Sequence, residues 1–375
     1  MTMTRKHIIS LFVLATTLLL SACIRDEAPN AECDILAVKA NWLEENNSIL
    51  SGKPVIKNNE VWFYVKEGTG IETLKQIEPE FELTPGASIV KDTVTENGER
   101  GINIHYTTTS EDGVWSKDYL VSFTIQSFIE NGKPFSFEHY TYDRYHSWYE
   151  VDTCGTELKW WASGNAGFAF TGKKEFPTTA DPEGVAGHCV KLTTRDTGSF
   201  GNMAGMPIAA GNIFIGEFQS ANAMKKPLEA TRFGLQIIPA EPVSLKGYYK
   251  YTPGEVFTDK MKRPVEGRKD TCAIYSVVYE VDPANVVTLD GSNVLSSKRI
   301  VLVAQLENPG EPTEWTQFEI PYKSANGNIF DKEKLQRGEY AITVVASSSK
   351  DGAFFEGAVG STLYVDEIEI VWNNE

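Results

Sequence analysis

The feature that most constrains the fold of this 375-residue chain is its pattern of short runs in which apolar and polar residues alternate. Gly, Pro, Asn and Asp residues separate these runs. A period of two places apolar side chains on one face of a β-strand. No stretch has the pattern of a long amphipathic helix. Short alternating runs separated by turn residues are typical of antiparallel β-sandwiches. The sequence therefore predicts an all-β fold.

A first, small domain is predicted over residues 33–126. Residues 55–65 predict a hairpin with polar residues at its turn. Residues 102–106 and 119–125 predict two further strands that are joined through an Asp-Gly turn. The Asn-Gly-Lys-Pro segment at 131–134 combines a turn signal with a break in periodicity, which indicates a domain boundary. We expect an immunoglobulin-like β-sandwich before that boundary.

A larger domain is predicted over residues 134–373. Long polar loops separate its candidate strands, and no repeats or helices support a propeller or a TIM barrel. Many strands with long loops indicate a jelly-roll sandwich. The candidate strands are rich in β-branched and aromatic residues and span 158–161, 190–194, 245–251, 274–281, 300–306, 315–320, 340–346 and 363–372.

The N-terminus has the pattern of a lipoprotein signal peptide over residues 1–22, followed by a tether over 23–32. A positive start precedes an apolar run, and Leu20-Ser21-Ala22-Cys23 resembles the bacterial lipobox, in which Cys23 is lipidated. The alternative is an ordinary secretory peptide. The acidic residues after Cys23 resemble the surface-export signal of Bacteroidota lipoproteins. We expect an outer-membrane protein exposed on the cell surface, with the periplasmic face as the alternative.

Charge and cysteine spacing exclude two function classes. The 51 acidic residues outnumber the 35 basic ones, and the net charge of −16 argues against a nucleic-acid partner. The five cysteines form no CxxC motif, which argues against a zinc site. Beyond Cys23, any disulfide pairing of Cys33, Cys154, Cys189 and Cys272 stays open. Cys189 and Cys272 lie in strand-like runs, where a small buried hydrophobic role is favoured.

Four ordered segments resemble the putative carbohydrate metabolism domain family, a family of Bacteroidota lipoproteins. They are WASGNAG at 161–167, AAGNIFIG at 209–216, GYYKYTPG at 247–254 and FEGAVGSTLYVDE at 355–367. The resemblance covers about residues 135–373. It implies a jelly-roll domain with a sugar-binding pocket, preceded by an immunoglobulin-like module. It implies no particular reaction.

Strand alternation suggests which residues form that pocket. In 245–251 it places Leu245, Gly247, Tyr249 and Tyr251 in the core and turns Tyr248 and Lys250 outward. In 158–161 it buries Trp160 and turns Trp161 outward, and Asn165 follows in a loop. An exposed aromatic ring beside polar groups suits a sugar. We predict glycan binding by Trp161, Asn165, Tyr248 and Lys250. The alternative is that Trp161 packs under the loop at 195–211 and Lys250 is a surface charge.

A structural calcium ion is a further expectation. Carbohydrate-binding jelly rolls often carry calcium between the first loop and the last strand, and Glu138 and Asp366 occupy positions that resemble its ligands. Asp366 falls on a mostly apolar strand face, where a carboxylate needs a partner. The favoured alternative is an Asp366 that accepts hydrogen bonds from loop amides. No other cofactor is required.

The predicted function is glycan binding for carbohydrate capture by a lipid-anchored protein. A structural or adhesive spacer is the first alternative, because tandem sandwiches on a tether can hold up a partner. A glycoside hydrolase is the second alternative and would need a pair of carboxylates. The candidates Glu150, Asp152, Glu217, Glu255 and Glu356 lie in no motif that assigns them an acid or base role, so we assign no catalytic residue.

Overall fold

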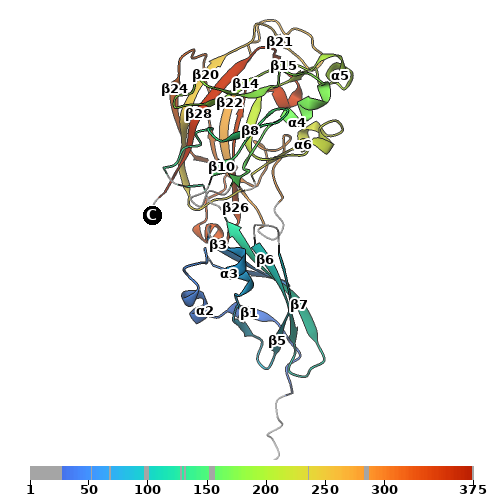
Figure 1. Ribbon diagram of the computed structural model, residues 1–375, viewed down its shortest axis with the longest axis vertical. Helices are drawn as coiled ribbons and strands as arrows, with labels where there is room; N and C mark the ends of the chain where they lie inside the picture. The colour runs from blue at the N-terminus through green and yellow to red at the C-terminus, as the bar shows by residue number, and fades with distance from the viewer. Residues whose placement is uncertain are drawn as a thin grey trace, which may run out of the picture.

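The computed structural model of the chain shows two units, each with its own hydrophobic core (Figure 1). It describes residues 28–373 except 52, 67–68, 97–100, 127–128, 131, 152–156, 235 and 283–286. The signal peptide, Cys23, Cys154 and Asp152 lie outside the described residues. Most elements are strands, and none of the helices in the described part of the chain has the length and hydrophobicity to cross a membrane. The predicted all-β class is confirmed.

The smaller unit is built on one five-stranded sheet in the order β2-β3-β7-β6-β5. The predicted hairpin is confirmed, because β2 and β3 pair antiparallel around Asn58, whose φ of 53° suits a tight turn. β6 and β7 also pair antiparallel, as predicted. The strands span Val55–Lys57 (β2), Glu60–Lys66 (β3), Ser88–Glu96 (β5), Gly101–Thr109 (β6) and Ser116–Gln126 (β7).

A thin second layer covers one face of that sheet. It consists of the strand pair β1 (Ile35–Val38) and β4 (Phe81–Leu83) with two short helices, α2 (Ala40–Glu45) and α3 (Ile71–Lys75). Both helices bury an apolar side chain, Trp42 on α2 and Leu74 on α3, in the core of this unit. β3 and β7 run parallel. This arrangement does not confirm the immunoglobulin-like assignment, which led us to expect a second full sheet.

The larger unit contains a five-stranded and an eight-stranded antiparallel sheet. The first, in the order β13-β14-β28-β20-β24, comprises Thr178–Asp181 (β13), Cys189–Thr193 (β14), Thr362–Trp372 (β28), Pro242–Thr252 (β20) and Thr316–Pro321 (β24). The second follows the order β12-β17-β26-β22-β23-β25, with β18 beside β17 and β19 beside β26. It comprises Trp161–Ala162 (β12), Asn212–Phe218 (β17), Thr231–Phe233 (β18), Gln236–Ile237 (β19), Ala273–Glu280 (β22), Ile300–Gln305 (β23), Lys323–Ser324 (β25) and Tyr340–Ser347 (β26).

The predicted strands of the larger unit are confirmed, with one exception. The run at 158–161 splits into β11 (Glu157–Leu158) and β12, which belong to different sheets. The strands that the sequence does not predict include β13, β17 and several pairs of two or three residues. Neither β13 nor β17 shows a clean period of two.

The main core lies between the two sheets of the larger unit. Leu245, Leu363 and Val365 from the five-stranded sheet join Ile274 and Ile342 from the eight-stranded sheet. Cys189 and Cys272 are buried free thiols, as predicted. Burial raises the pKa of both thiols to about 12, which makes them poor nucleophiles.

The eight-stranded sheet is covered on its outer face as well. Every residue of β22 and β26 except the last of each strand is buried. Phe214, Tyr275 and Val345 point away from the main core into a second cluster. Short helices lie on this side, namely α4 (Asn165–Phe168), α5 (Gly198–Met203) and α6 (Pro227–Ala230) (Figure 1). These helices and their loops leave a pocket above the sheet.

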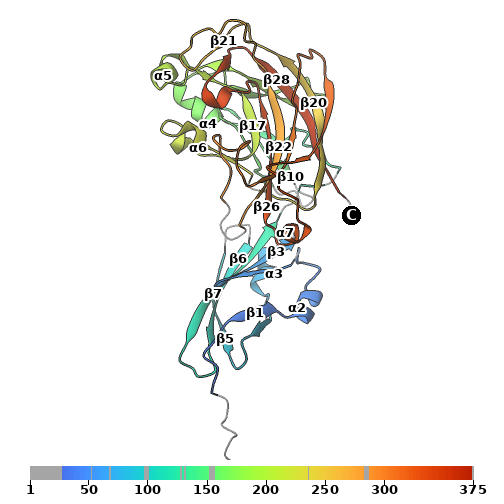
Figure 2. The ribbon, with the colours of Figure 1, turned by 180° about the vertical axis from the view of Figure 1, so that it is seen from behind.

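The two units meet through a small polar junction. Lys57 of β2 forms an ion pair with Asp282 beyond the end of β22. Tyr64 of β3 lies against Gly338, just after helix α7 (Lys332–Gln336). Figure 2 shows α7 beside β3 at this junction. The pocket lies in the larger unit, on the side of α4, α5 and α6.

Candidate functional site

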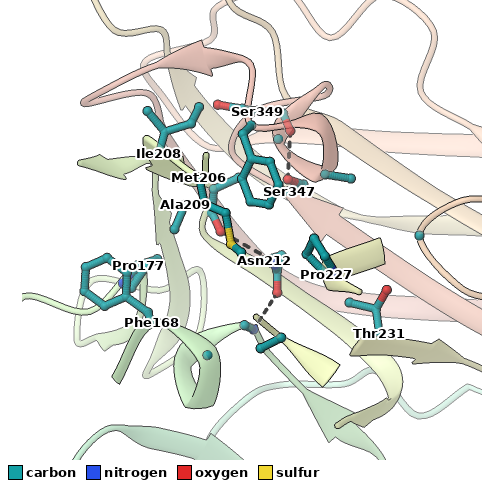
Figure 3. Close-up of a pocket in the computed structure, with 18 of the residues that line it drawn as sticks. Phe168, Pro177, Met206, Ile208, Ala209, Asn212, Pro227, Thr231, Ser347 and Ser349 are labelled. Atoms are coloured by element: carbon teal, nitrogen blue, oxygen red, sulfur yellow. Dashed lines mark hydrogen bonds between the residues drawn. The ribbon is translucent and has the colours of Figure 1, made fainter. Parts of the chain in front are cut away.

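A pocket of about 220 Å³ opens on the outer face of the eight-stranded sheet. Its floor comes from three strands, with Phe214 on β17, Tyr275 on β22 and Val345 on β26. Its walls come from α4, α5, α6 and the 3-10 turn η4 (Gly352–Phe354). Figure 3 shows Phe168, Met206, Pro227 and other wall residues around this space. A concave, largely apolar site of this kind is the usual form of a small-ligand pocket.

The pocket lining combines aromatic rings with polar groups, of which one, Lys350, is charged. The rings belong to Phe168, Phe200, Phe214, Phe218, Phe233, Tyr275 and Phe355. The polar side chains are Thr171, Thr197, Asn212, Thr231, Ser347, Ser349 and Lys350. None of the described residues that line the pocket is Asp, Glu or His. The described lining is therefore free of carboxylates in a protein whose net charge is −16.

Asn212 fixes one wall of the pocket to the floor. Its Oδ1 accepts a hydrogen bond from the backbone N–H of Gly164, 2.8 Å away, at the start of α4 (Figure 3). Its Nδ2 donates to the carbonyl of Ala210 at 3.3 Å. A side-chain amide carries two N–H hydrogens. Asn212 can thus hold the α4 segment with Oδ1 and still offer one N–H to a ligand.

A buried polar network holds the opposite wall. The Asp270 carboxylate is only 4% exposed and accepts hydrogen bonds from the hydroxyls of Ser349 and Ser361, at 2.6 and 2.7 Å. It also accepts one from the backbone N–H of Ala358 at 2.7 Å. Hydrogen bonds to a charged acceptor are stronger than neutral ones. This network fixes the segment that carries Ser347, Ser349 and η4 above the sheet.

Trp161 does not face solvent, so its predicted exposed position is wrong. The side chain is 7% exposed and lies against Phe135 and Phe137, with ring centroids 5.0 and 5.1 Å away. Its Nε1 donates to Glu150 Oε1 at 2.8 Å. Trp160 is also buried. Because the chain leaves β11 before it enters β12, the alternation assumed across this segment does not hold.

The amide of Asn165 is used within the protein. Asn165 is fully buried on α4, with 0% exposure. Its Nδ2 donates to the carbonyl of Thr178 at 2.8 Å, and its Oδ1 accepts from the N–H of Thr178 at 3.1 Å. The predicted bidentate interaction is therefore made with backbone, not with a ligand. These hydrogen bonds of Asn165 fix α4 in place, and its neighbours Gly164 and Gly167 line the pocket.

Tyr248 and Lys250 point outward from β20, as the alternation predicted. Leu245, Tyr249 and Tyr251 are buried on the other face. However, β20 belongs to the five-stranded sheet, and neither Tyr248 nor Lys250 lines the pocket. The structure thus does not bring the four predicted ligand residues together.

Glu138 and Asp366 hold the same loop, at 183–188, from two sides. Asp366 Oδ2 accepts from the N–H groups of Val185 and Ala186, at 2.7 and 3.3 Å. Glu138 Oε1 accepts from the N–H of His188 at 2.7 Å. The favoured alternative for Asp366, which was the binding of loop amides, is confirmed. Burial raises the pKa of Asp366 to about 6, although these hydrogen bonds act to lower it.

The oxygen atoms around this loop are of the type that calcium prefers. A β-carbon placed on Gly184 would lie 2.8 Å from Asp366 Oδ2 and from the carbonyl oxygens of Gly187 and His188. Among the described residues, no group of three or more His, Cys, Asp or Glu side chains is arranged to hold a metal. A calcium ion here would therefore depend on backbone carbonyls, and it stays a prediction.

The carboxylates considered for glycoside hydrolysis do not meet in the pocket. Glu217 and Glu255 are exposed, and Glu356 pairs with Arg268 at 3.4 Å. Burial raises the pKa of Glu150 to about 7, while the hydrogen bond from Trp161 lowers it. Glu150 is hydrogen-bonded to Trp161 and does not line the pocket. No pair of carboxylates among the described residues flanks the pocket space.

The pocket residues that the sequence reasoning missed are Phe200, Asn212, Ser347 and Ser349. A signal was present for Asn212, because three of the four segments that carry the family resemblance contribute to the lining. Ser347 and Ser349 had no such signal, since a run of serines after a strand is typical of an ordinary polar loop.

Comparisons with known proteins agree on a carbohydrate-related domain. The family model described as "Putative carbohydrate metabolism domain" matches residues 136–371. A solved structure described as a putative glycoside hydrolase from Bacteroides thetaiotaomicron is 40% identical, with 94% of this chain and 100% of that chain covered and a TM-score of 0.66. Another, described as a putative glycoside hydrolase from Bacteroides vulgatus, is 39% identical, with 66% and 100% covered and a TM-score of 0.60. No curated protein matches the chain.

Proposed function

Because this chain belongs to the putative carbohydrate metabolism domain family, we propose that the pocket on the eight-stranded sheet binds a saccharide. The observation that carries the proposal is the lining of that pocket, which combines aromatic rings with hydroxyl and amide groups. A sugar has C–H faces that pack on aromatic rings and hydroxyls that need donors and acceptors. The lining offers both within one concave space.

Each side of the pocket supplies a different part of this recognition. Phe200 on α5 lies at the rim and is 43% exposed, so its ring can pack on a sugar face. Asn212 on β17 offers an amide N–H, and Ser347 on β26 offers a hydroxyl. The Asn212 side chain is held by the N–H of Gly164, and the Ser347 hydroxyl is held by the carbonyl of Ser349. A site that is ordered before the ligand arrives loses less entropy on binding.

We propose capture of a saccharide rather than its cleavage. Two solved relatives are described as putative glycoside hydrolases, and most such enzymes use two Asp or Glu side chains that flank the scissile bond. No carboxylate lies among the described lining residues. The pocket can therefore bind and orient a sugar, but its described lining offers no acid and base for hydrolysis by this mechanism.

We also propose that the protein acts at the outer membrane, anchored by a lipid on Cys23 and exposed on the cell surface. The support for this is the pattern of the first 27 residues, with a signal peptide, a lipobox and acidic residues behind the cysteine. Along the chain, the smaller unit comes between Cys23 and the unit that carries the pocket. Protease added to intact cells should degrade the protein, and full protection would contradict surface exposure.

A glycan screen followed by titration calorimetry tests the proposed pocket. We expect Phe200→Ala to weaken binding of the best glycan about tenfold or more, because the loss of a stacked ring costs about 2 kcal/mol. Phe354→Ala is the matched control, since Phe354 is 54% exposed on nearby η4 and does not line the pocket. No saturable binding of any glycan would favour the spacer function. Steady release of reducing ends would favour a hydrolase.

A further inference from the structure

The outer face of the five-stranded sheet carries a row of alternating lysines and aromatic rings. Lys191 on β14 lies opposite Tyr364 on β28, and Tyr364 lies opposite Lys250 on β20. Trp315 comes directly before β24, whose first residue pairs with Tyr249. We call these four side chains (Lys191, Tyr364, Lys250 and Trp315) the cation–aromatic row. It lies on a different sheet from the pocket.

The rings of this row hold the Lys250 ammonium group in place. Lys250 Nζ lies 4.5 Å from the ring centroid of Trp315 and 4.6 Å from that of Tyr364. Lys191 Nζ lies 5.2 Å from the centroid of the same tyrosine ring. Attraction between a cation and an aromatic face is effective at such distances. The lysine is thus ordered by rings, where most surface lysines are free to move.

Lys250 differs from the other lysines on this face in its charge balance. Lys191 pairs with Asp181 at 3.5 Å, and Lys246 pairs with Glu369 at 3.0 Å. Within the part of the chain that the structure describes, no carboxylate lies within ion-pair distance of Lys250. Two aromatic rings hold this partly exposed cation, and no carboxylate among the described residues neutralises it. It is complementary to an anion that comes from outside the chain.

We propose that the cation–aromatic row is a second saccharide site, specific for sugars that carry a carboxylate. The ammonium group of Lys250 donates to the sugar carboxylate, and the exposed part of the Trp315 ring packs against the sugar C–H groups. The ligand class is an oligosaccharide that contains hexuronic acid. This site is separate from the proposed pocket and does not depend on its function.

Titration of the full protein with an oligomer of galacturonic acid tests this site, with a neutral galactose oligomer of the same length as the comparison ligand. We expect the acidic oligomer to bind more tightly and its affinity to fall as salt is raised. Lys250→Met keeps the unbranched stem between the rings but removes the charge. It should weaken binding of the acidic oligomer about tenfold or more, which is the loss of one charge-assisted hydrogen bond. Trp315→Ala should weaken it as well.

Two variants separate this site from general charge effects and from the pocket. Lys323→Met removes an equal charge from an exposed lysine on β25 and should leave the affinity unchanged. Phe200→Ala in the pocket should also leave binding of the acidic oligomer unchanged. The proposal is overturned if folded Lys250→Met binds like the unaltered protein or if the unaltered protein does not bind the acidic oligomer. It is also overturned if Phe200→Ala and Lys250→Met exchange these effects, because the acidic oligomer then occupies the pocket.

Discussion

Trp161 donates its indole N–H to Glu150 across 2.8 Å, in the interior of the larger unit. Two phenylalanine rings, Phe135 and Phe137, enclose the indole. Burial raises the pKa of Glu150 to about 7, while the Trp161 hydrogen bond and the charge of Lys133 lower it. The pair therefore combines a buried aromatic anchor with a carboxyl group that titrates near neutral pH.

The titration of Glu150 should make stability depend on pH. The pKa is about 7 in the folded protein and 4.5 in the unfolded chain, so the folded state binds more protons between these values. The contribution of Glu150 is fully present below pH 4.5 and is lost as pH rises through about 7. As pH rises from 5 to 8, the unaltered protein should lose stability that Glu150→Gln keeps. We expect the free energy of unfolding of Glu150→Gln, relative to that of the unaltered protein, to rise by on the order of 2 kcal/mol over this range. Urea unfolding at several pH values measures this, and a pH-independent difference would contradict it.

Truncation of Trp161 should affect stability and leave glycan binding intact. Trp161→Ala leaves a cavity and removes the hydrogen bond to Glu150, so we expect the free energy of unfolding to fall by about 3–5 kcal/mol. Trp115→Ala is the matched control, because Trp115 is 61% exposed and should change the free energy of unfolding little. Urea unfolding measures both variants. Folded Trp161→Ala that has lost glycan binding would instead support a ligand-contacting role for this residue.

Long strands with one buried face were predictable from the sequence. In β20 the alternation of Leu245, Tyr249 and Tyr251 with outward residues holds from Leu245 to Tyr251, because partner strands on both sides keep this part extended. The segment around Trp161 failed the same rule, because two residues between β11 and β12 change the direction of the chain. Periodicity is informative only where the strand is continuous.

The pocket itself could not be predicted in this way. It joins Gly164, Asn212 and Ser347, which are far apart in the sequence and come from a loop and two strands. Their proximity depends on the order β12-β17-β26, and a pattern of apolar residues does not encode strand order. The family resemblance indicated that a pocket exists, but it did not indicate which sheet bears it.

Calcium binding by the loop at 183–188 is testable through thermal stability. A ligand that binds only the folded state raises the melting temperature, so calcium should raise it by several degrees and EDTA should reverse the change. Asp366→Ala should abolish the response, because Oδ2 of Asp366 lies among the carbonyl oxygens of this loop. Asp118→Ala serves as the control, since it removes an exposed carboxylate on β7 of the smaller unit. If neither calcium nor EDTA changes the melting temperature, there is no calcium site here, and the loop amides are the partners of Asp366.

Two substitutions can separate the role of Asn212 in saccharide binding from its role in folding. Asn212→Asp keeps an oxygen acceptor for the N–H of Gly164 but removes the amide donor and places a carboxylate in the pocket. We expect it to weaken saccharide binding about tenfold or more, with a change in the free energy of unfolding of about 1 kcal/mol. Asn212→Ala also leaves Gly164 without its acceptor and should be the less stable of the two. Asn202→Asp adds the same charge at an exposed position on α5 outside the lining, and it should bind normally. Calorimetry and urea unfolding measure the three variants, and normal binding by Asn212→Asp would place the saccharide elsewhere.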